Sequence, residues 1–237
     1  MMTMNEENRI REAYRKRERL EPNNTVFFGY ENLAHFIRVQ ERHRETLRLL
    51  IKNGFRDLSR LRILDIGCGN GNMLRQFLQW GALPHNLAGI ELRLAQVDIG
   101  LNLNPNLDIY CGNAAELPLQ DETFSLVCQH TVFTSILDQS LRKQVAIEMN
   151  RVLQPEGAVL WYDFIYNNPK NPDVRGVRLD EIRELFPGYY PDKRRITLAP
   201  PLARRIPDSM LSFLYPLLAA LPLLCTHLLI LLIKPSK

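Results

Sequence analysis

A short apolar run that ends in an acidic residue and three alternating glycines constrains this chain most. Residues 61–71 read LRILDIGCGNG, and Gly67, Gly69 and Gly71 form its last part. The apolar residues suit a strand that is buried on both faces of a parallel sheet, and the glycines let the backbone turn tightly beside a ligand. Asn72 is expected to cap a following helix. The sequence therefore predicts a strand, a glycine turn and a helix as one unit.

This unit favours a nucleotide or nucleoside ligand. Amides of the turn and of the helix start converge where the strand order of an open sheet reverses. The spacing G-x-G-x-G differs from the G-x-G-x-x-G of a dinucleotide site. A second predicted strand, 86–91, ends in Glu91, whose carboxylate suits the two hydroxyls of a ribose. For the glycines alone, a tight turn without a ligand is the alternative.

Strand and helix patterns alternate along the middle of the chain, which predicts an α/β fold with a doubly wound, mainly parallel sheet. The predicted strands are 61–66, 86–91, 107–111, 123–129 and 157–164, and the predicted helices between them are 72–80, 93–101 and 138–153. Two further helices, 5–21 and 32–53, precede the first strand, and the second is expected to bury Phe36 and Ile51. We expect two parts, a helical segment 1–60 and a core 61–237.

The tail contains seventeen residues without formal charge, 217–233, which is near the length that spans a bilayer. Pro222 and the polar pair Thr226 and His227 argue against a span. We favour a helix over 207–221 and a strand over 226–233, after a short helix at 179–186 and a strand at 194–198. If Leu211, Leu214 and Leu218 are exposed, the apolar helix contacts a membrane surface or a second copy of the chain.

Composition favours a cytoplasmic protein without a metal site. The N-terminal residues are polar and lack the apolar segment of a signal peptide. The cysteines are widely separated and have no partners at metal-ligand spacing, so we expect reduced, buried thiols. They are Cys68, Cys111, Cys128 and Cys225. Basic residues outnumber acidic ones in both end segments, which we interpret as solvated helix faces rather than a nucleic-acid footprint.

Four segments in the correct order resemble the Rossmann-like, class I S-adenosylmethionine-dependent methyltransferases that act on small molecules. They are LDIGCGNG, GIEL, CGNAAELPLQDETFSLVCQH and RVLQPEGAVLWYDF, and they cover 61–164. The resemblance implies S-adenosylmethionine as cofactor, a seven-stranded sheet whose last strand is antiparallel between the fifth and sixth, and a lid formed by 1–60.

The resemblance also implies which residues contact the cofactor. Asp65, Gly67 and Gly69 correspond to positions at the methionine end, Glu91 to the ribose position, and Asn113 and Ala114 to the adenine position. The remaining predicted contacts are Cys68, Leu92 and Gln129. Asn113 and Glu91 depart from the Asp that is commonest at each place, which makes these two contacts less certain.

Candidate acceptor residues lie in the lid and in the Asn- and Pro-rich loop 165–177, which follows the fifth predicted strand. They are Tyr14, Tyr30, His35 and Arg38 in the lid, and Asn167 and Arg175 in the loop. Ordinary packing or surface roles are the alternatives. His130 and Asp163, at the ends of the fourth and fifth strands, are candidate bases for an acceptor that loses a proton. For His130 a packing role is the alternative, and Asp163 competes with Tyr162, which points to the opposite face.

These features predict methyl transfer to a small-molecule acceptor, with oxygen as the first choice of acceptor atom and nitrogen or carbon as alternatives. The resemblance suggests natural-product, glycan or lipid-linked metabolism. A non-catalytic module that binds the cofactor is the main rival. A nicotinamide oxidoreductase is disfavoured by the glycine spacing. A nucleic-acid partner is disfavoured by QHTVF after the fourth strand, where an N-P-P-aromatic type motif is absent. An oligomer is left open.

Overall fold

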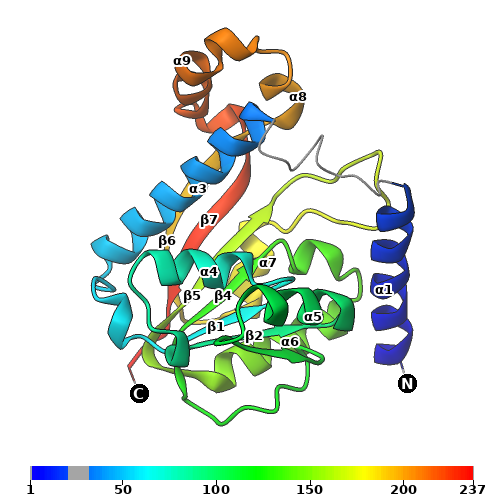
Figure 1. Ribbon diagram of the computed structural model, residues 1–237, viewed down its shortest axis with the longest axis vertical. Helices are drawn as coiled ribbons and strands as arrows, with labels where there is room; N and C mark the ends of the chain where they lie inside the picture. The colour runs from blue at the N-terminus through cyan, green and yellow to red at the C-terminus, as the bar shows by residue number, and fades with distance from the viewer. Residues whose placement is uncertain (1, 21–31, 237) are drawn as a thin grey trace.

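The computed structural model describes residues 2–20 and 32–236, in which one seven-stranded sheet carries helices on both faces (Figure 1). The strands are β1 Ile63–Ile66, β2 Leu87–Glu91, β3 Asp108–Cys111, β4 Phe124–His130, β5 Leu153–Phe164, β6 Tyr190–Leu198 and β7 Cys225–Ile233, and their order in the sheet is β3-β2-β1-β4-β5-β7-β6. The predicted doubly wound architecture is confirmed.

The strand order reverses at β1. This strand pairs in parallel with both β2 and β4, so that Ile66 lies opposite Ile90 on one side and Gln129 on the other. β7 is antiparallel to both β5 and β6, as predicted for the last strand. In open α/β sheets, ligands bind beyond the carboxyl ends of the strands at such a reversal, which here lies between the ends of β1 and β4.

Alternating strand residues point to opposite faces of the sheet and pack into two separate hydrophobic cores. Leu64 and Ile66 pack in the core shared with α6 and α7, whereas Ile63 packs with α3 and α4 on the other face. The helices are α1 Met2–Leu20, α3 Leu33–Lys52, α4 Asn72–Gln79, α5 Leu94–Leu103, α6 Gln139–Val152, α7 Leu179–Leu185, α8 Pro200–Ala203 and α9 Asp208–Ala219. Because apolar residues cover both faces, the sheet forms a rigid base for the segments at its carboxyl edge.

The uncharged tail divides as predicted. It supplies the end of α9, a 3₁₀ turn η4 (Pro222–Leu224) and β7. Among the described residues, the structure contains no helix with both the length and the apolar character needed to cross a membrane. In α9, Leu211 is buried and Leu214 and Leu218 are partly buried, so the condition for a membrane or dimer contact through these three residues is not met. A different face, with Phe213 and Leu217, is exposed.

The long helix α3 buries polar residues, which the apolar pattern did not indicate. Phe36 and Ile51 are 49% and 47% exposed, so their predicted burial is wrong. Glu41 is buried instead, and its Oε2 accepts hydrogen bonds from the Thr197 amide at 3.1 Å and the Tyr215 hydroxyl at 2.9 Å. The helix is therefore oriented by a carboxylate that joins it to β6 and α9, because a buried carboxylate requires such partners.

One of the predicted buried thiols is on the surface. Cys111 is exposed, whereas Cys68, Cys128 and Cys225 are buried. The reason is that Cys111 ends β3, which is the edge strand of the sheet and has only one buried residue among its four. Within the described ranges, no group of three or more His, Cys, Asp or Glu side chains is placed to hold a metal ion.

Candidate cofactor and acceptor site

The glycine turn after β1 has a backbone that requires glycine. Gly67, Gly69 and Gly71 have φ angles of +62°, +56° and +79°, in the left-handed region that other residues avoid. A Cβ atom on Gly67 would lie 2.6 Å from a methyl carbon of Val132, in the segment after β4. Gly71, rather than Asn72, is the N-cap of α4, and it offers no side-chain cap. The turn therefore brings bare backbone against the segment that follows β4.

A cavity of about 260 Å³, here called the inner cavity, opens beside this turn at the strand-order reversal. It is lined by six residues predicted from the sequence, namely Gly67, Glu91, Leu92, Asn113, Ala114 and His130. Helix α1 supplies three further lining residues, Glu7, Ile10 and Tyr14. The other predicted cofactor residues, Asp65, Cys68, Gly69 and Gln129, do not line it.

Glu91 is held in place at the wall of the inner cavity. Its Oε2 accepts a hydrogen bond from the Gly69 amide at 2.9 Å, and its Oε1 accepts from the Arg93 amide at 3.0 Å and the Arg93 Nε at 2.9 Å. The Arg93 guanidinium also lies 4.2 Å from the ring centre of Tyr14 and pairs with Glu18, both on α1. Arg93 was missed in the sequence, although it follows Glu91 by only two residues. It links the carboxylate to α1.

Asn113 makes a second link to α1. Its Nδ2 donates to Glu7 Oε1 at 2.6 Å, and its Oδ1 accepts from the Ala115 amide at 2.9 Å. A carbonyl oxygen has two lone pairs, so Oδ1 keeps the capacity to accept one further hydrogen bond. Glu7 was not predicted, because no motif in the N-terminal segment marks a residue that reaches the site only after α1 has packed.

Helix α1 is attached to the core mainly by polar contacts. The Glu6 carboxylate accepts hydrogen bonds from the Leu137 amide at 2.6 Å and the Asp138 amide at 3.3 Å. Arg9 donates to the Ser135 carbonyl at 2.6 Å, and the Tyr14 hydroxyl lies 3.2 Å from Ser135 Oγ. Figure 1 shows α1 standing at the side of the molecule, against the carboxyl edge of the sheet. Such an attachment can be released at a lower cost than a helix with a fully apolar face.

His130 lies at the end of β4 with a neutral imidazole. Its Nδ1 is 3.6 Å from Asp65 Oδ1, and neither ring nitrogen has a hydrogen-bond partner among the described residues. Burial lowers the pKa of His130 below its ordinary value, although Asp65 acts in the opposite direction. Gln129 is fully buried, and its Oε1 accepts from the Val132 amide at 3.1 Å. It shapes the turn after β4 without lining the cavity.

Asp163 lies away from both cavities described here. It is fully buried, and burial raises its pKa to about 7, with Thr134 and Arg142 partly offsetting the rise. Tyr162 packs in the core of the opposite face, with its hydroxyl 2.8 Å from Thr197 Oγ1. The two side chains therefore point in opposite directions, as expected, but neither lines a cavity.

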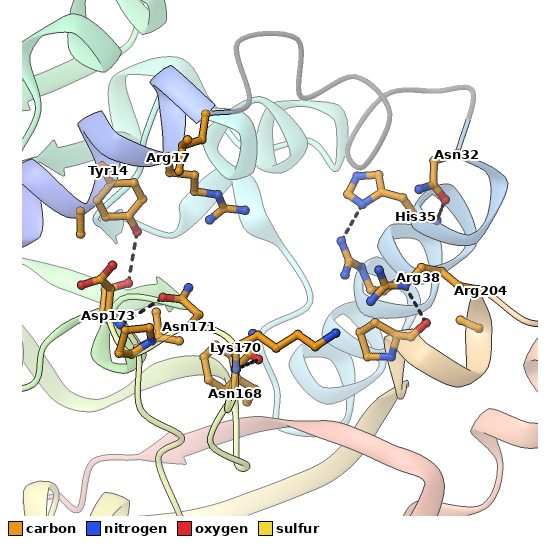
Figure 2. Close-up of a pocket in the computed structure, with 18 of the residues that line it drawn as sticks. Tyr14, Arg17, Asn32, His35, Arg38, Asn168, Lys170, Asn171, Asp173 and Arg204 are labelled. Atoms are coloured by element: carbon orange, nitrogen blue, oxygen red, sulfur yellow. Dashed lines mark hydrogen bonds between the residues drawn. The ribbon is translucent and has the colours of Figure 1, made fainter.

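A larger cavity of about 690 Å³, here called the outer cavity, adjoins the inner one (Figure 2). Its walls come from α1, α3, the loop after β5, α8 and α9. Ile10, Tyr14 and Ser135 line both cavities. Of the predicted acceptor residues, Tyr14, His35 and Arg38 line the outer cavity, and Figure 2 shows Tyr14 facing the two α3 residues across it.

Two predicted loop residues are used to hold the loop itself. Asn167 Oδ1 accepts from the Gly176 amide at 3.0 Å, and Arg175 Nη2 donates to Glu181 at 2.7 Å. Neither lines the outer cavity, whereas Asn168, Lys170 and Asn171 from the same loop do. Tyr30, the remaining candidate, lies outside the described residues. The loop was correctly located, but its composition did not show which side chains face the cavity.

Comparisons with known proteins agree with this arrangement. The family model of a methyltransferase domain matches residues 64–161. A sterol 4-C-methyltransferase of Caenorhabditis elegans is 28% identical over 116 residues, which are 46% of this chain and 33% of that protein. A demethylmenaquinone methyltransferase of Lactobacillus johnsonii is 26% identical over 132 residues, 53% of this chain and 52% of that protein. The chain thus spans between a third and about half of these relatives.

The fold has a close parallel among solved structures. An S-adenosylmethionine-dependent methyltransferase from Thermotoga maritima, described as a possible histamine N-methyltransferase, superposes with a TM-score of 0.64 at 16% identity. The superposition covers 92% of this chain and 97% of that one. Residues 64–161 thus match a methyltransferase domain, and the strand order and the glycine turn give the chain the fold of the Rossmann-like, class I S-adenosylmethionine-dependent methyltransferases.

Proposed function

We propose that the protein transfers a methyl group from S-adenosylmethionine to a small-molecule acceptor, with the cofactor in the inner cavity and the acceptor in the outer cavity. The observation that carries the proposal is that Ile10, Tyr14 and Ser135 line both cavities. A donor and an acceptor held on the two sides of this boundary meet at short range. Such positioning supplies a large part of the rate of a transfer between two bound molecules.

The residues of the inner cavity fit an adenosyl group. Gly67 and Val132 both line the inner cavity, and a Cβ on Gly67 would clash with Val132, so glycine is needed to keep the shape of this wall. Glu91 presents a carboxylate fixed by Gly69 and Arg93, which suits the hydroxyls of a ribose. Asn113 retains acceptor capacity for the adenine amino group. When bound, S-adenosylmethionine supplies an electrophilic methyl group on its sulfonium.

Glu7 and Tyr14 place α1 in the wall of the inner cavity, where the helix can act as a lid for the cofactor. The polar contacts of Glu6, Glu7 and Arg9 hold α1 over the site in the structure, and they can reform after binding. We therefore assign residues 1–60 as a lid and 61–237 as the core. In this assignment, Tyr14, His35 and Arg38 contact the acceptor.

Oxygen is the acceptor atom that best suits His130. A hydroxyl group loses a proton as its oxygen is methylated, and a neutral imidazole can accept that proton. His130 lines the inner cavity, and its lowered pKa keeps it neutral at pH 7. Asp163 lines neither cavity, so it is the weaker candidate for the base.

An exposed apolar surface along α9 and the residues just after it favours contact with a membrane surface or a second copy of the chain, although other residues form it than the three named from the sequence. The side chains in question are Met210, Phe213, Leu217 and Leu221, all at least half exposed except Met210 at 48%. The names of the two relatives given above refer to a sterol and to a menaquinone precursor. A lipid-linked acceptor and a cytoplasmic location remain predictions.

The test is acceptor-dependent turnover. The protein is incubated with S-adenosylmethionine carrying an isotopically labelled methyl group and with a panel of alcohols, phenols and amines, and both S-adenosylhomocysteine and labelled product are measured. We expect label in a hydroxyl-bearing acceptor. Glu91→Gln should lower the affinity for S-adenosylhomocysteine by roughly tenfold or more, since it weakens a charged hydrogen-bond pair. Glu116→Gln, on an exposed residue outside the cavity, is the matched control.

Two results would contradict the proposal. Labelled product that forms equally well with Glu91→Gln would place the cofactor elsewhere. Tight binding of S-adenosylhomocysteine without turnover of any acceptor in the panel would favour the non-catalytic module that the sequence leaves as an alternative.

A further inference from the structure

The outer cavity is strongly cationic. Positively charged side chains reach its lining from four separate elements, and they are Lys16 and Arg17 on α1, Arg38 on α3, Lys170 on the loop after β5, and Arg204 directly after α8. Among the described lining residues, Asp173 is the single carboxylate. It lies 3.7 Å from the Arg9 guanidinium, which offsets its charge. Even without Arg17, the described lining holds four cationic side chains, Lys16, Arg38, Lys170 and Arg204, and one carboxylate.

The charged groups surround one space. In Figure 2, Arg17 and Arg38 extend from opposite walls, and Lys170 reaches from the loop between them toward α3 and α8. Lys170 is exposed, with its backbone amide donating to Asn168 Oδ1 at 3.0 Å. The Arg204 Nε donates to the Pro200 carbonyl at 3.2 Å, which holds its guanidinium at the rim. A solvated helix face carries its charges on one helix, whereas these charges come from elements far apart in the sequence.

The histidines nearby respond to the same charge. His35 lines the outer cavity, with its Nδ1 2.6 Å from Arg38 Nη2. Burial, and then the charges of Arg38 and Arg42, lower the pKa of His35 to about 4. Burial and the same two arginines lower the pKa of His227 to about 3. Both rings are therefore neutral at pH 7 and do not add to the positive charge.

Part of the remaining lining is apolar. Ile10, Phe164, Leu198 and Ala203 contribute to it, so the cavity suits a ligand that combines a compact anion with an apolar or neutral body. A phosphate group carries about −1.5 to −2 charges at pH 7, and arginine binds its oxygens in a bidentate fashion. A carboxylate carries one charge, which several converging cations exceed.

From these observations we propose that the outer cavity binds a phosphate or diphosphate group, so that the acceptor is a phosphorylated small molecule. The anion site is inferred from the lining of the outer cavity alone. That the bound molecule is the methyl acceptor rests on the proposed function. With its phosphate between Arg38, Lys170 and Arg204, the rest of such a molecule extends toward Tyr14 and Ser135, which also line the inner cavity.

The experiment is calorimetric titration of the full chain, with and without saturating S-adenosylhomocysteine. The probes are n-octyl phosphate, its neutral counterpart n-octanol, and inorganic pyrophosphate. We expect n-octyl phosphate to bind at least about tenfold more tightly than n-octanol, because a charged hydrogen bond is worth about that factor or more. Pyrophosphate should compete with n-octyl phosphate for one site.

Single charge removals locate the site. Lys170→Gln and Arg204→Gln should each lower the affinity for n-octyl phosphate several-fold. Arg38→Gln should lower this affinity by roughly tenfold, and Arg38→Lys should recover part of it. Lys143→Gln, on the exposed face of α6 outside the cavity, is the matched control and should leave binding unchanged. Because Lys170 and Arg204 are exposed, their variants should fold, which circular dichroism and an unchanged S-adenosylhomocysteine affinity would verify.

A further arm separates a soluble phosphate ester from a lipid headgroup. It uses vesicles of phosphatidylcholine with and without phosphatidic acid. Vesicle binding that needs phosphatidic acid and is lost in Lys170→Gln and Arg38→Gln supports the site with a lipid as the source of the phosphate. Vesicle binding that survives both substitutions places membrane contact elsewhere and, if n-octyl phosphate does not bind, overturns the proposal.

Equal affinity for n-octyl phosphate and n-octanol would also overturn it, as would equal affinity in the wild type and Arg38→Gln. The two proposals fail separately. Phosphate binding without S-adenosylhomocysteine binding would contradict the proposed function and leave the anion site intact. S-adenosylhomocysteine binding without any preference for the phosphate probes would contradict the anion site and leave the proposed function intact.

Discussion

At the scale of single residues, the site depends on a few positions whose chemistry the sequence displays. Glu91 and His130 end strands β2 and β4, Gly67 and Asn113 lie in the turns after β1 and β3, and all four line the inner cavity. Each can be found from a motif at the end of a predicted strand. Their partners on α1 cannot, because Glu7 and Glu18 come within reach of Asn113 and Arg93 only through tertiary packing.

Gly67 offers a direct test at this scale. Gly67 and Gly81 both have positive φ angles, but a Cβ would meet Val132 at Gly67 and nothing within 4 Å at Gly81. Gly81→Ala should lower the free energy of unfolding by about 1 kcal/mol from backbone strain, and Gly67→Ala should lower it further because its Cβ also clashes with Val132. Only Gly67→Ala should also lower the affinity for S-adenosylhomocysteine, by roughly tenfold, since overpacking displaces the wall of the cavity.

Chemical denaturation measures the first effect, and calorimetric titration measures the second. If both variants keep the wild-type affinity, the glycine turn does not contact the cofactor.

At the scale of elements, most of the sheet follows from sequence patterns, and the exceptions have physical reasons. β5 begins at Leu153, four residues before the predicted start, because the segment containing Pro155 and Gly157 continues the strand instead of making a separate turn. β6 begins at Tyr190 rather than 194, since its polar first half pairs with residues 229–233 of β7. Register with a neighbour, rather than hydrophobic periodicity, sets these ends.

The apolar tail illustrates the same point. Its composition is compatible with a membrane span, a helix or a strand, and the choice depends on Pro222 and on a vacant place between β5 and β6. The structure uses it as β7, which pairs with both neighbours. The loop 165–177 is the opposite case, because periodicity locates it but cannot say that Lys170 rather than Arg175 faces the outer cavity.

Removing residues 217–237 should therefore destroy the core. β7 lies inside the sheet, so its loss leaves β5 and β6 with unpaired edges. It also removes Leu229 from one hydrophobic core and Ile230 from the other, which exposes both cores to water. We expect an insoluble chain, measured as the soluble fraction after expression. Removal of residues 235–237, which follow the last contacts of Lys234, is the control and should leave the protein folded. A folded product of the longer truncation would refute the assigned role of β7.

At the scale of the whole molecule, buried titratable groups set how stability depends on pH. Burial lowers the pKa of His35 and His43 to about 4 and of His227 to about 3. Below pH of about 6.5, the unfolded chain takes up protons that these folded rings do not. The free energy of unfolding should therefore fall as the pH is lowered from 7 to 5.

Asp163 acts in the opposite direction. Its folded-state pKa is raised from 3.8 to about 7, so the folded chain binds a proton more readily than the unfolded chain between these values. Its contribution to stability grows on acidification and is lost as the pH rises to 7. Asp163→Asn should make the loss of stability between pH 7 and 5 steeper by about 1 kcal/mol per pH unit.

Urea denaturation at several pH values measures this slope. Asp98→Asn, an exposed carboxylate on α5, should keep the wild-type slope. An unchanged slope in Asp163→Asn would show that Asp163 is ionised in the folded protein at pH 7.

The most direct test of the central claim is thermal unfolding of the whole chain with S-adenosylmethionine, S-adenosylhomocysteine, NAD or no ligand. At about 100 times the dissociation constant, a ligand adds roughly 2.7 kcal/mol to the free energy of unfolding, which raises the midpoint by about 5–10 °C for a chain of this size. The inner cavity, with Glu91 fixed at the glycine turn, predicts a rise with the two adenosyl ligands and none with NAD. Two results would contradict this account: a rise of the midpoint with NAD alone, or no rise with any of the three ligands.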